Sequence, residues 1–357
     1  MAKYDFSVAF AAAAQTAEGT FNSTLDGISA TLAGDPGGTD DGLLLGDPES
    51  GIGQSGLSIG IGRGRREKAP LSGSFTTPLA DFLRAEVPTL SFSFPFCGNR
   101  GTTSATAADA DFVPLTGVDA ILNGAGLTGT AWGSGVGHSY KFGSVEPFSA
   151  LVYVSGSRLE LLDCRCSRLA IEFTPGSIPI ATADISVGRI KDPSAASISV
   201  ASLPTLTYGE QATVSAPTVE STAHTWQALR GFSSLTLAIS PEIEEIADSN
   251  AADGSVKEIA GRTTTIDATI FSDDASTNEV YELDQIFQTA SSGLDQLSFQ
   301  VGSDAGDAST AVAVQYLAPQ PEVTSVTPVE LGSKAGVEVS LELGHSTANS
   351  ELELIFR

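Results

Sequence analysis

Few residues of this chain stand at spacings that could do chemistry. Cys164 and Cys166 lie two positions apart, Cys97 is distant from both, and the three histidines are scattered. A zinc site needs about four such ligands close together, so this pattern does not favour one. Residues at i and i+2 share one side of a strand, but the geometry there disfavours a direct disulfide. We therefore expect reduced, buried thiols made in a reducing compartment.

The other candidate motifs match known binding motifs only in part. Gly60–Gly64 (GIGRG) resembles the opening of a dinucleotide loop, but it lacks the third glycine and the Gly-Lys-Ser/Thr of a phosphate loop. Oxygen-rich turns at Asp248–Asp253 and Ser303–Asp307 could hold calcium, although neither has the full loop spacing. No nucleophile, base and orienting group can be assembled from the motifs present. The sequence therefore predicts no catalytic residue, no cofactor and no metal, and thus not an enzyme.

The charge balance excludes one large class of partner. With 43 acidic against 18 basic residues, the chain carries a net charge of −25. Binding to phosphate backbones needs Lys and Arg on one face, so nucleic acid should be repelled. Copies of the chain also repel one another, and an assembly must overcome this by burying apolar surface or by salt screening. Adaptation to a salty environment is an alternative reason for the acidity.

Alternation of apolar and polar residues predicts that the fold is mainly β. Val337–Leu343 reads Val, Glu, Val, Ser, Leu, Glu, Leu, and Glu351–Phe356 continues in the same way to the last residues. This period of two buries one side of a strand and leaves the other wet. Further strands are expected at Tyr4–Ala14 (a strand or a helix), Val87–Cys97, Ser149–Val154, Ser157–Leu162, Ser167–Phe173, Ala181–Val187 and Phe232–Ile239. No apolar run is long enough to span a membrane.

Three short helices are expected among the strands. Thr77–Leu83 has a threonine cap followed by proline at the first helical position. Thr116–Ala125 is a second candidate, which Gly126 could close. Tyr281–Ala290 places three large apolar residues on one helical face.

Organisation along the chain predicts two β domains. The 167–188 stretch resembles 323–344, each reading as strand, turn with proline and glycine, strand and glycine. This indicates an internal duplication into residues 1–195 and 196–357, although hairpins often look alike. A long glycine-rich loop, Gly34–Gly64, precedes a basic cluster in this acidic chain. That cluster, our candidate for ring-to-ring contacts, consists of Arg63, Arg65, Arg66 and Lys68.

One stretch of the sequence resembles a known family. Phe142–Ile190 is similar in order and pattern to the tail tube (major tail) proteins of long-tailed bacteriophages, with Leu162–Arg165 filling a characteristic Cys-Arg segment. Asp163 stands there where the family usually has a small residue. Thr116–Ala131 resembles the helix upstream of that segment, and the chain from Arg262 onward resembles the family's C-terminal half.

The resemblance implies a β-sandwich or barrel with a flanking helix, assembled into stacked rings around a hollow channel for genome delivery. It implies trimeric or hexameric rings, depending on whether the duplication is real. Partners would be other copies of the chain and the tape-measure, tail terminator and baseplate proteins, in a virion tail assembled in the host cytoplasm. DNA would pass through without specific binding, along an acidic lumen. The alternatives are a decoration or baseplate β-protein and an adhesive surface β-sandwich of a salt-adapted microbe.

Overall fold

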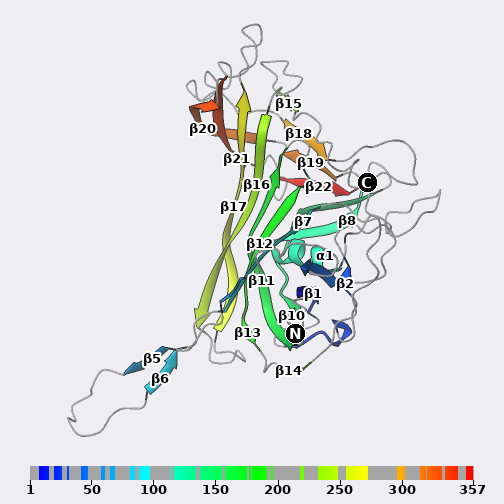
Figure 1. The fold of residues 1–357 in the computed structure, drawn as a ribbon, viewed down its shortest axis with the longest axis vertical. Coiled ribbons are helices and arrows are strands. Elements are labelled where there is room, and N and C mark those ends of the chain that lie inside the picture. Colours follow the sequence, from blue (N-terminus) through cyan, green and yellow to red (C-terminus); the bar gives the residue numbers. More distant parts are fainter. Residues whose placement is uncertain are drawn as a thin grey trace, which may run out of the picture.

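A computed structural model describes the chain in part. The described residues are 8–15, 20–25, 30–31, 42–46, 58–60, 65–68, 81–84, 88–96, 114, 116–133, 137–154, 157–174, 177, 179–190, 194–195, 218–220, 232–247, 255–271, 296–301, 314–318, 320–331, 334–344 and 351–356. They are mainly β, as the alternation predicted, with one α-helix and one short 3-10 turn (Figure 1).

Eight antiparallel strands form the largest layer, here called the main sheet. Their order across the sheet is β4 (Ser58–Gly60), β7 (Thr89–Pro95), β12 (Ile180–Ser186), β11 (Ser157–Phe173), β16 (Phe232–Ala247), β17 (Ser255–Phe271), β21 (Lys334–Gly344) and β20 (Gln320–Leu331). Every neighbouring pair is antiparallel, so strand direction alternates from one edge to the other. Side chains on the long strands β7, β12, β11, β16, β17 and β21 alternate between a buried face and a wet face.

The strand β11 belongs to two sheets because it is long and bent. Its second half lies in the main sheet, and its first half pairs with β10 (Phe148–Val154), which pairs in turn with β1 (Val8–Ala14). The small strands β3 (Gly42–Gly46), β2 (Ala30–Thr31), β13 (Arg189–Ile190) and β14 (Ser194–Ala195) complete this N-terminal sheet. The two strands that we expected at Ser157–Leu162 and Ser167–Phe173 are thus one continuous strand.

Two irregularities bend β11. At Asp163 the backbone takes a φ of 53°, a left-handed conformation that is uncommon outside glycine. With its amide oriented to fit its neighbours, Gln15 donates to Asp163 Oδ1 at 3.0 Å and accepts from the Asp163 amide at 3.2 Å. Gly188 packs so closely there that a Cβ on it would lie 2.8 Å from Asp163 Cβ. The second irregularity is a bulge at Ser167, where the register with β12 shifts.

A six-stranded short sheet forms the opposite layer. Its order is β15 (Thr218–Glu220), β18 (Gln296–Val301), β19 (Val314–Ala318), β22 (Glu353–Phe356), β9 (His138–Phe142) and β8 (Leu127–Ala131). The strand β22, which alternation predicted, is therefore paired on both sides. Two further strands, β5 (Arg65–Lys68) and β6 (Asp81–Arg84), pair only with each other and stand apart from both layers (Figure 1).

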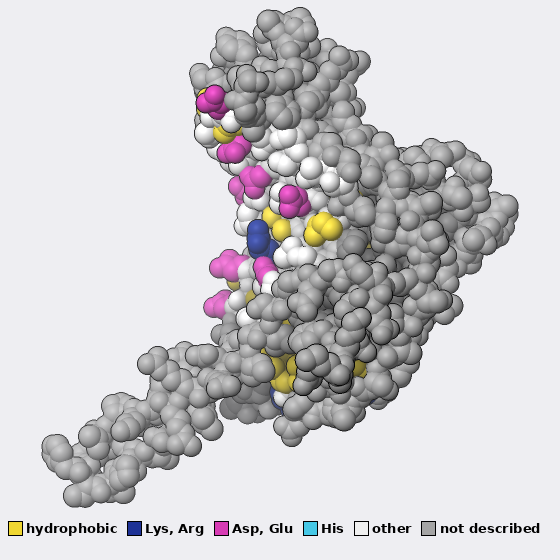
Figure 2. Space-filling view, viewed as in Figure 1, with side chains coloured by type: hydrophobic (Ala, Val, Ile, Leu, Met, Phe, Trp, Pro, Cys, Tyr) yellow, Lys and Arg dark blue, Asp and Glu magenta, His cyan; other side chains and the backbone are white. Residues whose placement is uncertain are grey.

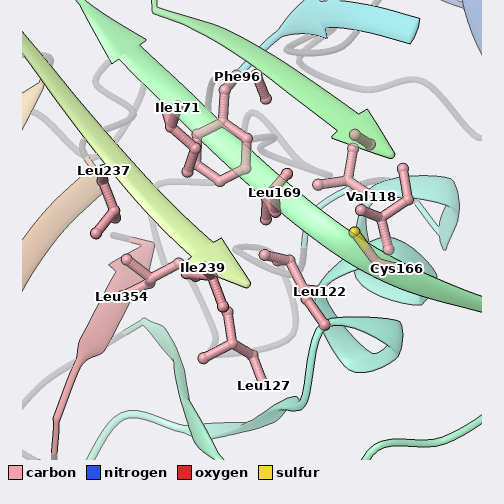
Figure 3. Packing of buried hydrophobic residues seen from close by; sticks show 14 of the residues in the cluster. Phe96, Val118, Leu122, Leu127, Cys166, Leu169, Ile171, Leu237, Ile239 and Leu354 are labelled. Atoms are coloured by element: carbon pink, nitrogen blue, oxygen red, sulfur yellow. The ribbon is translucent and has the colours of Figure 1, made fainter. Parts of the chain in front are cut away.

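One hydrophobic core joins the layers and the helix α1 (Thr116–Gly124) (Figure 3). Leu169, Ile171, Leu237 and Ile239 line its main-sheet side, and Leu354 enters from the short sheet. A chain of tilted and edge-on aromatic contacts crosses the core from Phe10 through Phe92, Phe94 and Phe96 to Phe356 and Tyr140, with ring centroids 4.6 to 6.4 Å apart. Such contacts add to the free energy gained by burying the rings.

The helix is attached to the core at both ends. Near its start, Tyr140 Oη donates to Asp119 Oδ1 at 2.6 Å, and burial raises the Tyr140 pKa far above its usual range. Near its end, a Cβ on Gly124 would lie 2.5 Å from the Phe148 ring, so glycine permits the close approach to β10. Gly126, with a φ of +88°, closes the helix as predicted.

The expected helix at Thr77–Leu83 is contradicted over Asp81–Leu83, which lie in β6. The proline and the threonine cap favour a helix locally, but pairing with β5 satisfies the backbone of these residues instead. The expected helix at Tyr281–Ala290 and the two candidate calcium turns lie outside the described residues. Cys164 and Cys166 are free and buried, in agreement with the sequence; Cys97 lies outside the described residues.

We predict that Cys166 resists thiol reagents while the protein is folded. Burial raises the pKa of this thiol to about 12, and the reactive thiolate is therefore scarce at pH 8. In a Cys97→Ser variant, a maleimide should label the folded chain negligibly at pH 8 and label both remaining thiols in guanidinium chloride. Because the folded pKa is raised, the stability linked to this proton is complete below the unfolded pKa of about 9.0 and is lost toward pH 12. Rapid labelling of the folded chain would contradict the buried placement.

Candidate assembly surface

The wet face of the main sheet is mostly polar in the described strands, although it includes the large apolar side chain of Ile180, which is 40% exposed. Its residues alternate with the core residues on each strand and are mostly Ser, Thr, Asp and Glu. They are Thr89, Ser91, Ser93, Ile180, Thr182, Asp184, Ser186, Arg168, Ala170, Glu172, Thr236, Ala238, Thr265, Asp267, Thr269, Glu338, Ser340, Glu342, Glu322, Ser325, Thr327 and Val329. We call this surface the polar face.

Hydroxyl groups on the polar face hydrogen-bond across neighbouring strands. Ser91 Oγ donates to Asp184 Oδ1 at 2.6 Å, and Ser93 and Thr182 share a hydrogen bond of 2.9 Å between their hydroxyls. On the other half of the sheet, Ser340 Oγ donates to Asp267 Oδ1 at 2.6 Å. Cross-strand pairs of this kind fix the register and hold short side chains flat against the sheet.

Negative charge dominates this face. It carries six carboxylates, on Glu172, Asp184, Asp267, Glu322, Glu338 and Glu342, and one guanidinium, on Arg168. Arg168 Nη1 lies 3.9 Å from Asp184 Oδ2 with both side chains well exposed, an ion pair that contributes little. Figure 2 shows acidic side chains outnumbering basic ones along the described flank of the molecule. A polyanion near this face is repelled, and mobile cations accumulate there.

The main sheet has two open edges among the described strands. One edge is β20, which pairs only with β21 and contains Pro321 and Pro328. The other is β4, which pairs only with β7. Prolines are usual on edge strands because they lack a backbone donor, and they limit unspecific pairing. The remaining donors and acceptors of the two edge strands form a template for another strand.

A two-stranded arm projects from the middle of the sheet. The strand β16 pairs with β11 only over Leu235–Ile239, whereas β16 and β17 continue to pair with each other as far as Ala247 and Ser255 (Figure 1). The arm is rich in acids, including the exposed Glu242 and Glu244. Near its end, the side chain of Ile246 is 43% exposed. Among the described residues, Ile180 is the other large apolar residue that is exposed.

The structure partly places the predicted basic cluster. Arg65, Arg66 and Lys68 lie on β5, where Arg65 stands opposite Arg84 and Lys68 opposite Asp81. Arg63 lies outside the described residues. The cluster is therefore carried by the separate β5–β6 hairpin and not by the polar face. Sequence reasoning missed the polar face itself, although its signal was the polar half of the same alternation that located the core.

Arg262, at the base of the arm, connects the main sheet to the short sheet. Its Nη2 donates to both carboxylate oxygens of Glu351, at 2.7 and 2.9 Å, and its guanidinium stacks 4.1 Å from the Phe142 ring centroid. Both charged side chains are largely buried, at 25% and 13% exposed. A planar, charged group suits this combination of stacking and carboxylate binding.

Among the described residues no group of three or more His, Cys, Asp or Glu is placed to hold a metal ion. None of the described helices is long and apolar enough to cross a bilayer.

Comparisons with known proteins give partial likenesses. No family model and no curated protein matches the sequence. Among solved structures, the chain is similar to one described as the tail of an empty GTA particle with C6 symmetry, at 17% identity and a TM-score of 0.25, covering 37% of this chain and 91% of that chain. It is also similar to one described as the virion of a native gene transfer agent particle, at 16% identity and a TM-score of 0.26, covering 40% and 95%. Both TM-scores are too low to indicate a shared overall fold.

We predict that Arg262 and Glu351 stabilise the fold through each other. In a double-mutant cycle with Arg262→Leu and Glu351→Leu, we expect each single change to destabilise the protein and the two to be coupled by about 1 kcal/mol. Arg262→Lys should recover only part of the coupling because an ammonium stacks less well on Phe142. Guanidinium unfolding followed by fluorescence measures each value. Additive losses in the double variant would show that the pair does not interact energetically.

Proposed function

We propose that this chain is a structural, non-enzymatic subunit of a phage tail tube, which assembles into stacked rings around a channel for genome delivery. The observation that carries the proposal is the main sheet, with one face in a core, one face mostly polar and acidic, and two edges that have no further partner among the described strands. The resemblance of Phe142–Ile190 and of the C-terminal strands to tail tube proteins supplies the class of assembly.

The polar face suits the wall of a DNA channel. A channel for a polyanion should not bind it, and six carboxylates facing one guanidinium repel phosphates at short range. Some hydroxyls between the acids already bond across strands, as Ser93 and Thr182 do with each other. In the proposed tube the polar face lines the lumen, and the short sheet and α1 lie on the outside.

Closure into a ring would pair both edge strands of the main sheet. A sheet edge left open invites uncontrolled pairing, and a barrel removes edges altogether. In the proposed ring, β20 of one copy meets the β4 edge of the next copy, so that the main sheets form one continuous wall. If each chain holds two tube units, three chains give the six units that the family resemblance implies. The tape-measure, tail terminator and baseplate proteins are its proposed partners in the virion.

Stacking of rings is assigned to the basic β5–β6 hairpin. The hairpin stands apart from both layers, and its backbone pairs only with itself (Figure 1). The acidic arm of β16 and β17, with Glu242 and Glu244, provides a surface of opposite charge. In the proposed tube the hairpin of one ring contacts the arms of the neighbouring ring.

Electron microscopy of the purified chain, at low and then high salt, tests the proposed function. We expect hollow tubes or stacked rings with a central hole, more readily at high salt because screening weakens the repulsion between acidic copies. A reconstruction should place the polar face at the hole, with three chains in each ring. Dispersed monomers at every salt concentration would exclude a tube subunit, and binding to capsids or glycans would then point to a decoration or adhesive protein.

Charge reversal tests the proposed stacking contact. The Arg65→Glu/Arg66→Glu variant should form rings but few or short tubes, because like charges then face each other between rings. Adding Glu242→Arg and Glu244→Arg should restore tube length, as measured by electron microscopy and sedimentation. Lys141→Glu, which reverses an exposed charge on the short sheet, is the control and should leave tube length unchanged. Full-length tubes from the first variant would refute the contact.

A further inference from the structure

The eight strands of the main sheet divide into two quartets with the same topology. The first quartet is β4, β7, β12 and β11, and the second is β16, β17, β21 and β20, each in the order of the sheet. In both quartets the chain visits the first position, then the second, then the fourth and finally the third. Because direction alternates across the sheet, corresponding strands also run the same way.

The register between corresponding strands is the same. In the first quartet Thr89–Pro95 pair with Ile180–Ser186 over seven positions. In the second quartet Thr265–Phe271 pair with Gly336–Glu342 over seven positions. Residues of β17 correspond to residues of β7 at a shift of 176, and residues of β21 correspond to residues of β12 at a shift of 156. All seven pairs keep the same correspondence. The second shift also superposes the second strands of the two stretches whose sequences resemble each other.

The same bulge interrupts the third and fourth strands of each quartet, which are β12 with β11 and β21 with β20. Ser167 is the extra residue between Cys166, opposite Ile185, and Arg168, opposite Asp184. Thr324 is the extra residue between Val323 and Ser325 at the corresponding position. Each extra residue makes the same hydrogen bond of 3.0 Å: Ser167 Oγ donates to Asp184 O, and Thr324 Oγ1 donates to Ser340 O. A bulge that recurs at the corresponding position with the same hydrogen bond is a specific structural feature of the strand pair and not a random irregularity.

A cross-strand hydrogen bond is repeated with its partners exchanged. Ser91 donates to Asp184 at 2.6 Å between the second and third strands of the first quartet. At the corresponding pair of the second quartet, Ser340 donates to Asp267 at 2.6 Å. The serine is on the second strand of the first quartet and on the third strand of the second quartet, and the aspartate is on the other strand in each case. The position of the pair in the quartet is the same. The short sheet shows no such tandem order, since its two hairpins flank β22 as β8-β9-β22-β19-β18.

We infer that the main sheet is a tandem duplication, and that the β11–β16 junction inside the chain is the template for the junction between copies. The occupant of the β20 edge is then the β4 edge of a second copy of this chain. With eight alternating strands in each copy, β20 and the incoming β4 run antiparallel, as β11 and β16 do. This inference concerns how copies join and does not depend on the assembly being a phage tail.

The template fixes the register of the new junction. Inside the chain, Ala170 lies opposite Ala238 and Glu172 lies opposite Thr236. Thr327 and Val329 are the counterparts of Ala170 and Glu172, at a shift of 157 residues past the bulge. The β4 counterparts of Ala238 and Thr236 are Gly60 and Ser58, as their pairings with β7 and β17 show. Between copies, Thr327 should therefore lie opposite Gly60, and Val329 opposite Ser58.

The faces of the two copies agree in this register. Thr327 lies opposite Glu338, and Gly60 lies opposite Thr89, so both occupy positions on the wet side of the sheet. A slip of one residue would put the wet positions of one copy beside the core positions of the next. Only registers that differ by an even number of residues preserve the two faces, and the template selects one of these.

Mixing two variants, each with one cysteine added at the edge of the main sheet, tests the junction. The background is Cys97→Ser, with Cys164 and Cys166 left in the core. Thr327→Cys is made in one chain and Gly60→Cys in the other, where the counterpart Ala238 shows that a Cβ is tolerated. After mixing at high salt and mild oxidation, we expect a disulfide-linked dimer as the main product, because directly opposed residues are close enough to bridge.

Three controls make the result specific. Thr327→Cys alone and Gly60→Cys alone should stay monomeric on a non-reducing gel, since a head-to-tail junction does not place a residue opposite itself. Thr327→Cys mixed with Ile59→Cys, one residue out of register, should give less than about a tenth of the dimer. Equal dimer from the slipped pair, dimer from one variant alone, or no dimer under any salt condition would overturn the inference.

Microscopy of the same samples separates this inference from the proposed function. Cross-linked closed rings that never stack into tubes would support the junction and count against the tail tube. Hollow tubes whose subunits fail to cross-link at Thr327 and Gly60 would support the tube and overturn the junction.

Discussion

Backbone hydrogen bonding at the edges of the main sheet is the constraint on which the rest of this structure depends. Eight strands alternate in direction, one face packs on a core, and the edge strands β4 and β20 each have one partner among the described strands. Such edges must be paired or protected in a stable protein. Pro321 and Pro328 on β20 narrow the range of strands that can add there. The edge is thus selective, and closure with an identical copy satisfies it without leaving a new edge.

The bend of β11 lets one strand serve both the N-terminal sheet and the main sheet. Asp163 turns the strand in a left-handed conformation supported by Gln15, and the Ser167 bulge resets the register against β12. Between these points Cys164 and Cys166 both enter the core, where α1 and the aromatic chain pack. In the Cys-Arg segment, which resembles tail tube proteins, both thiols are thus part of the core packing.

Alternation was enough to predict the class of fold and several of the long strands, because a strand with one buried face has an apolar side chain at every second residue, as in Val337–Leu343. The helix closed by Gly126 was predictable for a similar local reason. The strand at Asp81–Leu83 was not, since a distant partner overrides its local helix signals. The two quartets were only partly visible, because their strands are shifted by 176, 156 and 157 residues, and connections of different length hide a common register. The polar face required knowledge of which strands are neighbours.

The net charge of −25 and the tandem quartets both affect how strongly copies of the chain repel one another in an assembly. Each junction between separate copies must overcome repulsion among acidic surfaces, whereas a junction inside the chain is held by the covalent link at a high effective concentration. In the proposed ring, joining two quartets in one chain makes half of the quartet junctions internal. The repulsion then opposes only the β20–β4 contacts. A main sheet built in this way can keep a strongly acidic wall with fewer intermolecular contacts to hold it together than a ring of single quartets would need.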